Sequence, residues 1–133
     1  MLSTATIPFL IHALIETPAA LTFILKPSSQ LQPLPPSAAL ILQSFGGLLL
    51  TSNLIALIFI RRPFDDAARQ AALAFSFWHL WPSYRAYMRI NGYTEEGEEE
   101  ASTTKTLGGP LVHLGVHIVL LTMFLGTWYF GNA

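Results

Sequence analysis

The chain has 133 residues, of which 52% are hydrophobic and only 11% charged, and its formal net charge is −1. Soluble domains have roughly 25% charged residues, so this composition excludes an ordinary soluble protein and indicates an integral membrane protein. The near-neutral charge also excludes the basic surface of a nucleic-acid-binding protein, and the absence of cysteine excludes disulfides, thiolate metal sites and cysteine nucleophiles.

Four apolar segments follow one another along the chain. Each is close to the roughly 20 residues that a helix needs to cross about 30 Å of hydrocarbon. Nothing alternates with the period of a barrel strand, and backbone polar groups in lipid must be satisfied within the segment, so helices are expected. We predict an all-α fold, a four-transmembrane-helix bundle forming one integral membrane domain over 1–133, with helices at about 7–25, 37–60, 67–90 and 111–130.

The first segment contains the only acidic residue that lies inside a predicted span, because the other seven fall in connections. His12 and Glu16 are four residues apart and share one helix face. An ionisable side chain at the bilayer centre costs at least about 2.5–3.5 kcal/mol on insertion scales, which makes it a functional candidate. Pro18 removes a backbone donor and predicts a local kink. The start of the chain has no positively charged region, so we expect a span and not a cleaved signal.

The second segment follows a proline-rich turn and carries a few polar side chains. Asn53 is the one that we assign to substrate binding, and Gln43 and Ser52 are its polar neighbours along this helix. The tight turn at 61–66, "RRPFDD", ends the helix. Asp65 and Asp66 in this turn favour the N-terminus of the third helix through the helix dipole.

The third segment, "FWHLWPSYR" in its central part, is the least apolar of the four. His79 lies near its middle, and Arg85 follows about two turns later. Trp78 and Trp81 flank the histidine and fit either a substrate contact or an interfacial aromatic belt. We therefore treat His79 as a catalytic candidate, and the arginine and the two tryptophans as substrate-binding candidates.

The longest connection, 91–109, holds five of the eight acidic residues, and we expect a solvated, mobile loop there. Capture of a cation or a partner by this loop is the alternative interpretation. The fourth segment contains "LVHLGVH", in which His113 and His117 are four residues apart and lie on one face. All four histidines of the chain therefore fall within predicted spans.

An even number of crossings places both termini on the same side of the membrane. The positive residues are nearly balanced between the two sides, but the Arg61–Arg62 pair lies directly at a helix end and favours cytoplasmic termini. The positive residues on the side of the termini are Arg61, Arg62 and Arg69, and those on the opposite side are Lys26, Arg85, Arg89 and Lys105. In a eukaryotic host we expect the chain in the endoplasmic reticulum membrane.

These polar residues predict acid/base chemistry on a lipophilic substrate that enters from the bilayer. A low-dielectric site favours the neutral form of a carboxyl group, so Glu16 is expected to donate a proton to an alkene, epoxide or enone. We expect His12 to hold that proton, and His79 or His117 to take one from the other side of the substrate. No cofactor is required for isomerisation, cyclisation or dehydration of this kind. The expected substrate contacts are Asn53, Trp78, Trp81, Arg85 and His113, with Phe75 as a further aromatic shield.

The stretch "HALIE", residues 12–16, resembles the His-x-x-x-Glu stretch of the emopamil-binding-protein-like sterol isomerase superfamily. The resemblance implies a small helical membrane bundle that isomerises or binds a sterol-like ligand through an intramembrane acid, here Glu16 with His12. In this chain the motif lies on the first helix and not on a later one. The whole run of sequence also resembles uncharacterised fungal integral membrane proteins, some of which accompany natural-product pathways of secondary metabolism.

Three other interpretations remain open at this point. The His12–Glu16 pair can simply fix helix register by hydrogen bonding between helices. The histidines and Glu16 are also suitable metal ligands, and two histidines on different helices can bind haem. The chain can instead be a non-enzymatic membrane subunit or a lipid- or ligand-binding module that works as a homo-oligomer or beside a membrane enzyme. Phosphate-binding-loop, dinucleotide, serine-triad and zinc-protease motifs are absent.

Overall fold

The computed structural model describes residues 3–91 and 108–131, and this part of the chain is helical and contains no strand. The predicted all-helical class with four long helices is confirmed. Apart from its two ends, the acidic connection expected at 91–109 lies outside the described residues. The elements are η1 (Thr4–Thr6), α1 (Ile7–Leu25), η2 (Pro27–Ser29), α2 (Pro36–Ile60), α3 (Asp66–Ile90) and α5 (Gly109–Phe130).

The helices begin at residues that suit a helix N-terminus. α1, α2 and α5 each have a proline in the first turn, where the missing N–H would have no partner in any case. α3 has an aspartate cap instead: the Asp65 carboxylate accepts a hydrogen bond from the Ala68 N–H at 2.9 Å. This bond, together with Arg62 at 2.9 Å, holds the pKa of Asp65 below its usual value. The turn between α2 and α3 is therefore fixed by polar contacts.

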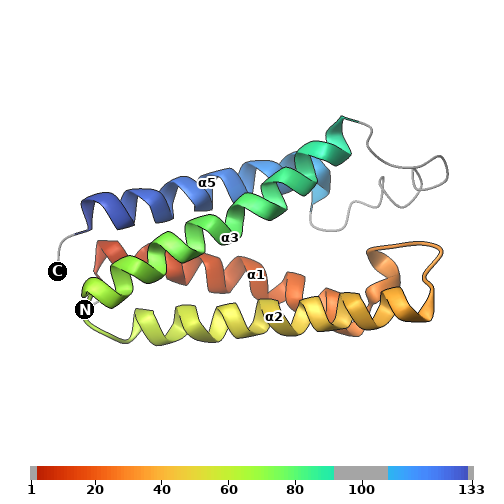
Figure 1. The fold of residues 1–133 in the computed structure, drawn as a ribbon, viewed down its shortest axis with the longest axis horizontal. Helices are drawn as coiled ribbons and strands as arrows, with labels where there is room; N and C mark the ends of the chain where they lie inside the picture. The colour runs from red at the N-terminus through yellow and green to blue at the C-terminus, as the bar shows by residue number, and fades with distance from the viewer. Residues whose placement is uncertain (1–2, 92–107, 132–133) are drawn as a thin grey trace.

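The four helices form two closely packed pairs, α1 with α2 and α3 with α5 (Figure 1). The start of α1 and the end of α5 lie at the same end of the bundle, as an even number of crossings requires. We call this the terminal end. The opposite end, where α1 is joined to α2 and where α3 ends and α5 begins, is called the loop end.

The core near the terminal end is an aromatic cluster drawn from three helices. Phe9 contacts the edges of Phe75 and Phe124, and the latter two rings stack at 5.1 Å. Small residues fill the remaining contacts and allow the helices to approach closely. These are Ala13, Ala56 and Ala72, packed with Leu120. The cluster lies next to the polar site described below, on the side of the terminal end.

α1 (with η1), α2 and α5 are long and apolar enough to cross a membrane. Their outward faces carry large exposed apolar side chains, among them Leu14, Leu21, Leu48, Leu54, Ile118 and Val119. Such a surface is typical of contact with lipid and not with water. α3 has 25 residues, the same length as α2, but it is not apolar enough to belong to this group. The expected association with a membrane is thus supported by three helices.

Candidate functional site

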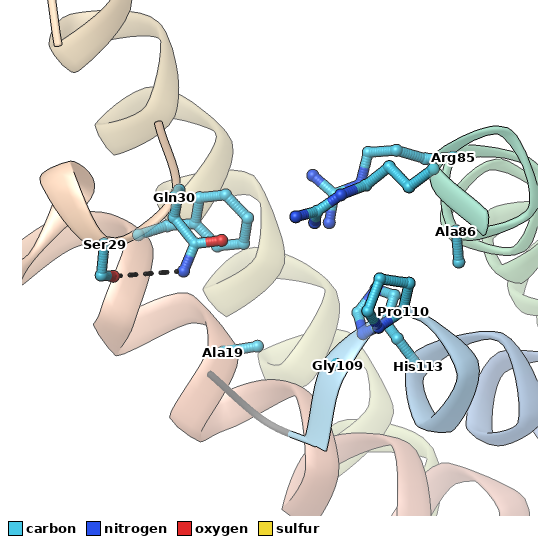
Figure 2. A pocket seen from close by; sticks show the side chains of 10 residues that line it. Ala19, Ser29, Gln30, Arg85, Ala86, Gly109, Pro110 and His113 are labelled. Carbon is cyan, nitrogen blue, oxygen red and sulfur yellow. Dashed lines mark hydrogen bonds between the residues drawn. The ribbon is translucent and has the colours of Figure 1, made fainter. Parts of the chain in front are cut away.

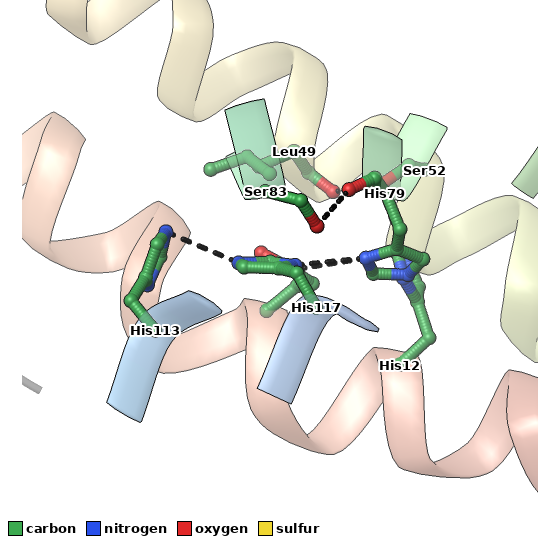
Figure 3. Close-up of polar contacts among 8 residues, drawn as sticks. His12, Leu49, Ser52, His79, Ser83, His113 and His117 are labelled. Carbon is green, nitrogen blue, oxygen red and sulfur yellow. Dashed lines mark hydrogen bonds and ion pairs between the residues drawn. The ribbon is translucent and has the colours of Figure 1, made fainter. Parts of the chain in front are cut away.

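Four histidines form one hydrogen-bonded row through the middle of the bundle (Figure 3). His12 Nδ1 on α1 lies 3.0 Å from His79 Nε2 on α3, and His79 Nδ1 lies 2.9 Å from His117 Nδ1 on α5. His117 Nε2 lies 3.1 Å from His113 Nε2, one turn closer to the loop end. The first three rings are buried, whereas His113 is half-buried. The row connects the two helix pairs across the centre of the bundle.

The hydroxyl group of Ser52 on α2 fixes the direction of the row. Ser52 donates its proton to the Leu49 carbonyl oxygen at 2.7 Å, so its oxygen accepts from His12 Nε2–H at 3.1 Å. A neutral imidazole has one donor and one acceptor nitrogen, so His12 Nδ1 accepts from His79 Nε2–H. Continuing along the row, His117 Nδ1–H donates to His79 and His113 Nε2–H donates to His117. Both nitrogens of His12, His79 and His117 have partners in these neutral forms, whereas Nδ1 of His113 keeps a lone pair with no partner among the described residues.

The carboxyl group of Glu16 lies beside the row without belonging to it. Its Oε1 atom is 3.5 Å from His117 Nδ1 and 3.9 Å from His79 Nδ1. Glu16 is only 3% exposed, and Oε1 has no hydrogen-bond partner within residues 3–91 and 108–131. A buried polar atom without a partner is costly, which makes this oxygen the natural contact for a group that enters the site.

A pocket of about 250 Å³ lies between α1 and α5 directly at this carboxyl group. Its polar lining residues are Glu16, His113 and His117. The rest of the wall is apolar and consists of Ile15, Pro18, Ala19 and Val116. The pocket is therefore suited to a mostly apolar molecule that meets one acid and one histidine with a lone pair to offer.

Aromatic rings hold the buried imidazoles in place. The His12 ring meets the edge of Phe75 at a centroid distance of 4.7 Å, and the His79 ring stacks on Phe124 at 5.7 Å with an interplanar angle of 16°. These contacts restrict rotation of the two rings, so their nitrogen atoms stay aligned with the neighbouring histidines.

The structure brings together the residues predicted to be catalytic, His12, Glu16, His79 and His117. His79 has both ring nitrogens occupied by other histidines, so it links the row and does not face the pocket. The rings of His12 and His79 meet directly.

The predicted substrate-binding residues are distributed over different places. His113 lies in the row and on the pocket wall, whereas Asn53 is buried and donates a hydrogen bond to Thr17 Oγ1 at 3.0 Å. Trp78, Trp81 and Arg85 line a separate groove.

The sequence interpretation gave Phe124 and Arg89 no role in a functional site. Arg89 follows Arg85 by four residues, a spacing that places both on one helix face and could have identified it.

Three donor atoms of the site also have a spacing that suits a metal ion. Glu16 Oε1, His79 Nδ1 and His117 Nδ1 are separated by 3.9, 3.5 and 2.9 Å. Ligands of a tetrahedral zinc ion with bonds of about 2.0–2.1 Å lie about 3.3–3.4 Å apart. His12, Glu16 and His79 form a second such group, with all ligand atoms within 4.8 Å of one another. The donor set fits a metal ion provided that it displaces the proton shared by His79 and His117.

Comparison of the chain with models of protein families, with curated proteins and with solved structures gives no match. The resemblance to the sterol isomerase superfamily therefore rests on His12 and Glu16 alone. Inferences about function come from the geometry of the site.

Proposed function

We propose that this chain is a four-span membrane protein that performs acid/base chemistry on a lipophilic small molecule. α3 is assigned as the fourth span because its outward face exposes Phe77, Leu80 and Trp81, and its length of 25 residues corresponds to about 37 Å of helix. Cytoplasmic termini, the endoplasmic reticulum membrane and a homo-oligomer or partner enzyme stay predictions.

The observation that carries the proposal is Glu16, whose buried Oε1 atom has no partner in the described part of the chain and which is one of the residues that line the pocket. Burial in a low-dielectric site favours the neutral acid form of a carboxyl group. A neutral Glu16 can give its proton to a carbon or oxygen atom of a bound alkene, epoxide or enone.

The same pocket supplies a base. His113 Nδ1 carries the one lone pair of the row that stays without a partner in the described residues, and His113 lines the pocket together with Glu16. In an isomerisation, Glu16 forms the new C–H bond and His113 removes a proton from a neighbouring carbon, so the double bond moves and the substrate gains no net proton.

The row then returns the proton to the acid. His113 passes its Nε2 proton to His117 Nε2 across 3.1 Å, and His117 gives its Nδ1 proton to the Glu16 carboxylate across 3.5 Å. Together with the two steps at the substrate, these four transfers leave the number of protons unchanged, so neither a cofactor nor an external acid is needed. The imidazoles of His113 and His117 end as their other neutral tautomers and return to the starting ones before the next turnover. Cyclisation follows the same sequence, and dehydration differs in that a hydroxyl group leaves as water after protonation.

The experiment is an untargeted profile of lipophilic metabolites from cells that produce the wild type, Glu16→Gln or His113→Phe at matched membrane abundance. We expect both variants to lose one species and to accumulate a precursor of equal mass, or one that differs by water. Asn53→Ala is the matched control, because Asn53 is a buried polar residue of the same bundle that does not line the pocket. Profiles of Glu16→Gln that match the wild type would overturn the proposal.

A metal centre is the second candidate function, favoured by the spacing of Glu16, His79 and His117. A metal ion held there would act as a Lewis acid towards a substrate oxygen. Metal analysis of the purified chain distinguishes the two functions. About one equivalent of zinc that disappears in His79→Asn supports the metal centre, and product formation that persists after chelation supports acid/base chemistry.

A further inference from the structure

Two neighbouring pockets at the loop end differ sharply in chemistry. The first is small, about 40 Å³, and its lining includes two arginines from consecutive turns of α3 (Figure 2). The second is an apolar groove of about 390 Å³ between α2 and α3. Phe23 and Arg85 line both pockets, so the two are adjacent and meet at these two side chains. The polar pocket is lined by Ser29, Gln30, Arg85, Arg89, Gly109 and His113, and the groove by Ile41, Leu42, Phe45, Trp78, Trp81 and Arg85.

The polar pocket has the features of an anion site. Arg85 and Arg89 supply two positive charges, and neither forms a salt bridge with another described residue. The first residues of α5, Gly109 and Pro110, form part of the wall, so the positive end of the helix dipole is directed at the pocket. α5 has no side-chain cap and no acidic residue in its first turn that would neutralise the positive end of the helix dipole.

The size of the polar pocket limits the anion that fits. A buried water molecule needs at least about 10–15 Å³ of cavity volume. The polar pocket, at about 40 Å³, therefore holds a group of about three or four heavy atoms. A carboxylate has this size. The guanidinium group of Arg85 also lies 5.8 Å above the Phe23 ring, which holds it at the junction of the two pockets.

The groove is suited to the apolar part of the same molecule. Its volume of about 390 Å³ lies within the usual range for small-molecule pockets. Phe45 and Trp78 stack in its wall with an interplanar angle of 8°, and Phe23 meets Phe45 edge to face. Arg85 is the one charged residue of its lining, at the end that joins the polar pocket.

From these observations we propose that the chain binds a lipophilic carboxylate, a fatty-acid-like amphiphile, with its carboxylate at Arg85 and Arg89 and its chain along Phe45, Trp78 and Trp81. This inference does not depend on the proposed function, because neither the carboxylate site at Arg85 and Arg89 nor the groove uses Glu16. The polar pocket nevertheless shares Ala19 and His113 with the pocket at Glu16, so a carboxylate bound there lies next to the candidate catalytic site.

The groove tryptophans provide the test. Dibromostearate, whose bromine atoms quench tryptophan fluorescence at contact, is titrated into the purified full chain in a neutral detergent. We expect saturable quenching of Trp78 and Trp81 in the wild type, and binding at least tenfold weaker in Arg85→Gln. Arg69→Gln is the matched control, because Arg69 lies on the same helix but lines neither pocket. Arg85→Lys, which keeps the charge, should restore part of the affinity.

Dibromostearyl alcohol separates charge recognition from partition into the detergent. The proposal predicts that the alcohol quenches at least tenfold more weakly than the acid. Equal quenching by acid and alcohol, or equal affinity of Arg85→Gln and Arg69→Gln, would overturn it. Glu16→Gln should bind dibromostearate like the wild type, so a loss of product in that variant and a loss of binding in Arg85→Gln report on separate claims.

Discussion

Replacing Gly46 by alanine tests how closely α1 and α2 pack. A Cβ atom at Gly46 would lie 2.6 Å from Cγ1 of Ile24, 2.9 Å from the Ala20 carbonyl oxygen and 3.0 Å from Cβ of Phe23. Cγ1 of the β-branched isoleucine can move only by a change of χ1, and the carbonyl oxygen belongs to the backbone of α1. The two helices would therefore have to separate by a few tenths of an ångström.

The neighbouring glycine gives a matched control for the magnitude. Nothing lies within 4 Å of a Cβ atom built on Gly47. Alanine in a helix interior is favoured over glycine by about 0.5–1 kcal/mol, and this gain applies to both positions. Overpacking costs about 1–3 kcal/mol and applies to Gly46 alone. We expect Gly47→Ala to be neutral or slightly stabilising, and Gly46→Ala to be less stable than it by about 1–3 kcal/mol.

The measurement is unfolding of both variants in detergent micelles, followed by circular dichroism. Because Phe23 lines the apolar groove, Gly46→Ala should also weaken dibromostearate binding, whereas Gly47→Ala should not. A Gly46→Ala protein as stable as Gly47→Ala would show that α1 and α2 are not in the close contact described above.

Three further predictions concern the polar row and the cap of α3. His79→Leu removes two buried hydrogen bonds, so its free energy of unfolding should fall by about 1–3 kcal/mol, and an unchanged value in detergent would contradict the row. Phe124→Ala removes the ring on which His79 stacks and should cost about 3–5 kcal/mol in the same assay, whereas a loss below 1 kcal/mol would mean that the core closes without it. Asp65→Ala should lower the unfolding midpoint at neutral pH. The pKa of Asp65 is lower in the folded state than in the unfolded state, so the charged carboxylate stabilises the fold at pH values above the unfolded pKa. This stabilisation is lost as the pH falls through the folded-state pKa. The difference in unfolding midpoint between Asp65→Ala and the wild type should therefore shrink in acid. A difference independent of pH would contradict the charged cap.

The helices could be predicted because each apolar run ends at a residue with a clear local preference. α1 covers Ile7–Leu25, the range expected from the sequence, and α2 begins at Pro36, one residue before the expected start. Proline suits the first turn of a helix, and Asp65 supplies the cap before α3. The spacing of His12 and Glu16 predicts that they share one helix face, and both side chains are buried in the bundle.

The relative rotation of the helices could not be predicted. α2 and α5 are apolar on all sides, so periodicity does not indicate which face meets a neighbour. Close approach of α2 to α1 at Gly46 depends on this rotation, and so does the placement of Trp78 and Arg85, which line the groove and not the pocket at Glu16. The contact between Ser52 and His12 depends on the same rotation.

The most direct test of the central claim, that Glu16 transfers its proton to a lipophilic substrate, is an isotope measurement. Membranes that contain the wild type or Glu16→Gln are incubated in D2O with a lipid extract from the host, and the masses of the lipophilic products are measured by mass spectrometry. Because His113 is half-buried, the proton that it takes from the substrate exchanges with D2O before the row returns a proton to Glu16. For an isomerisation or a cyclisation we therefore predict one deuterium at a carbon position of the product in the wild type, and we predict that this species is missing with Glu16→Gln. The same labelled product at the same rate from both membranes would contradict a catalytic role for Glu16.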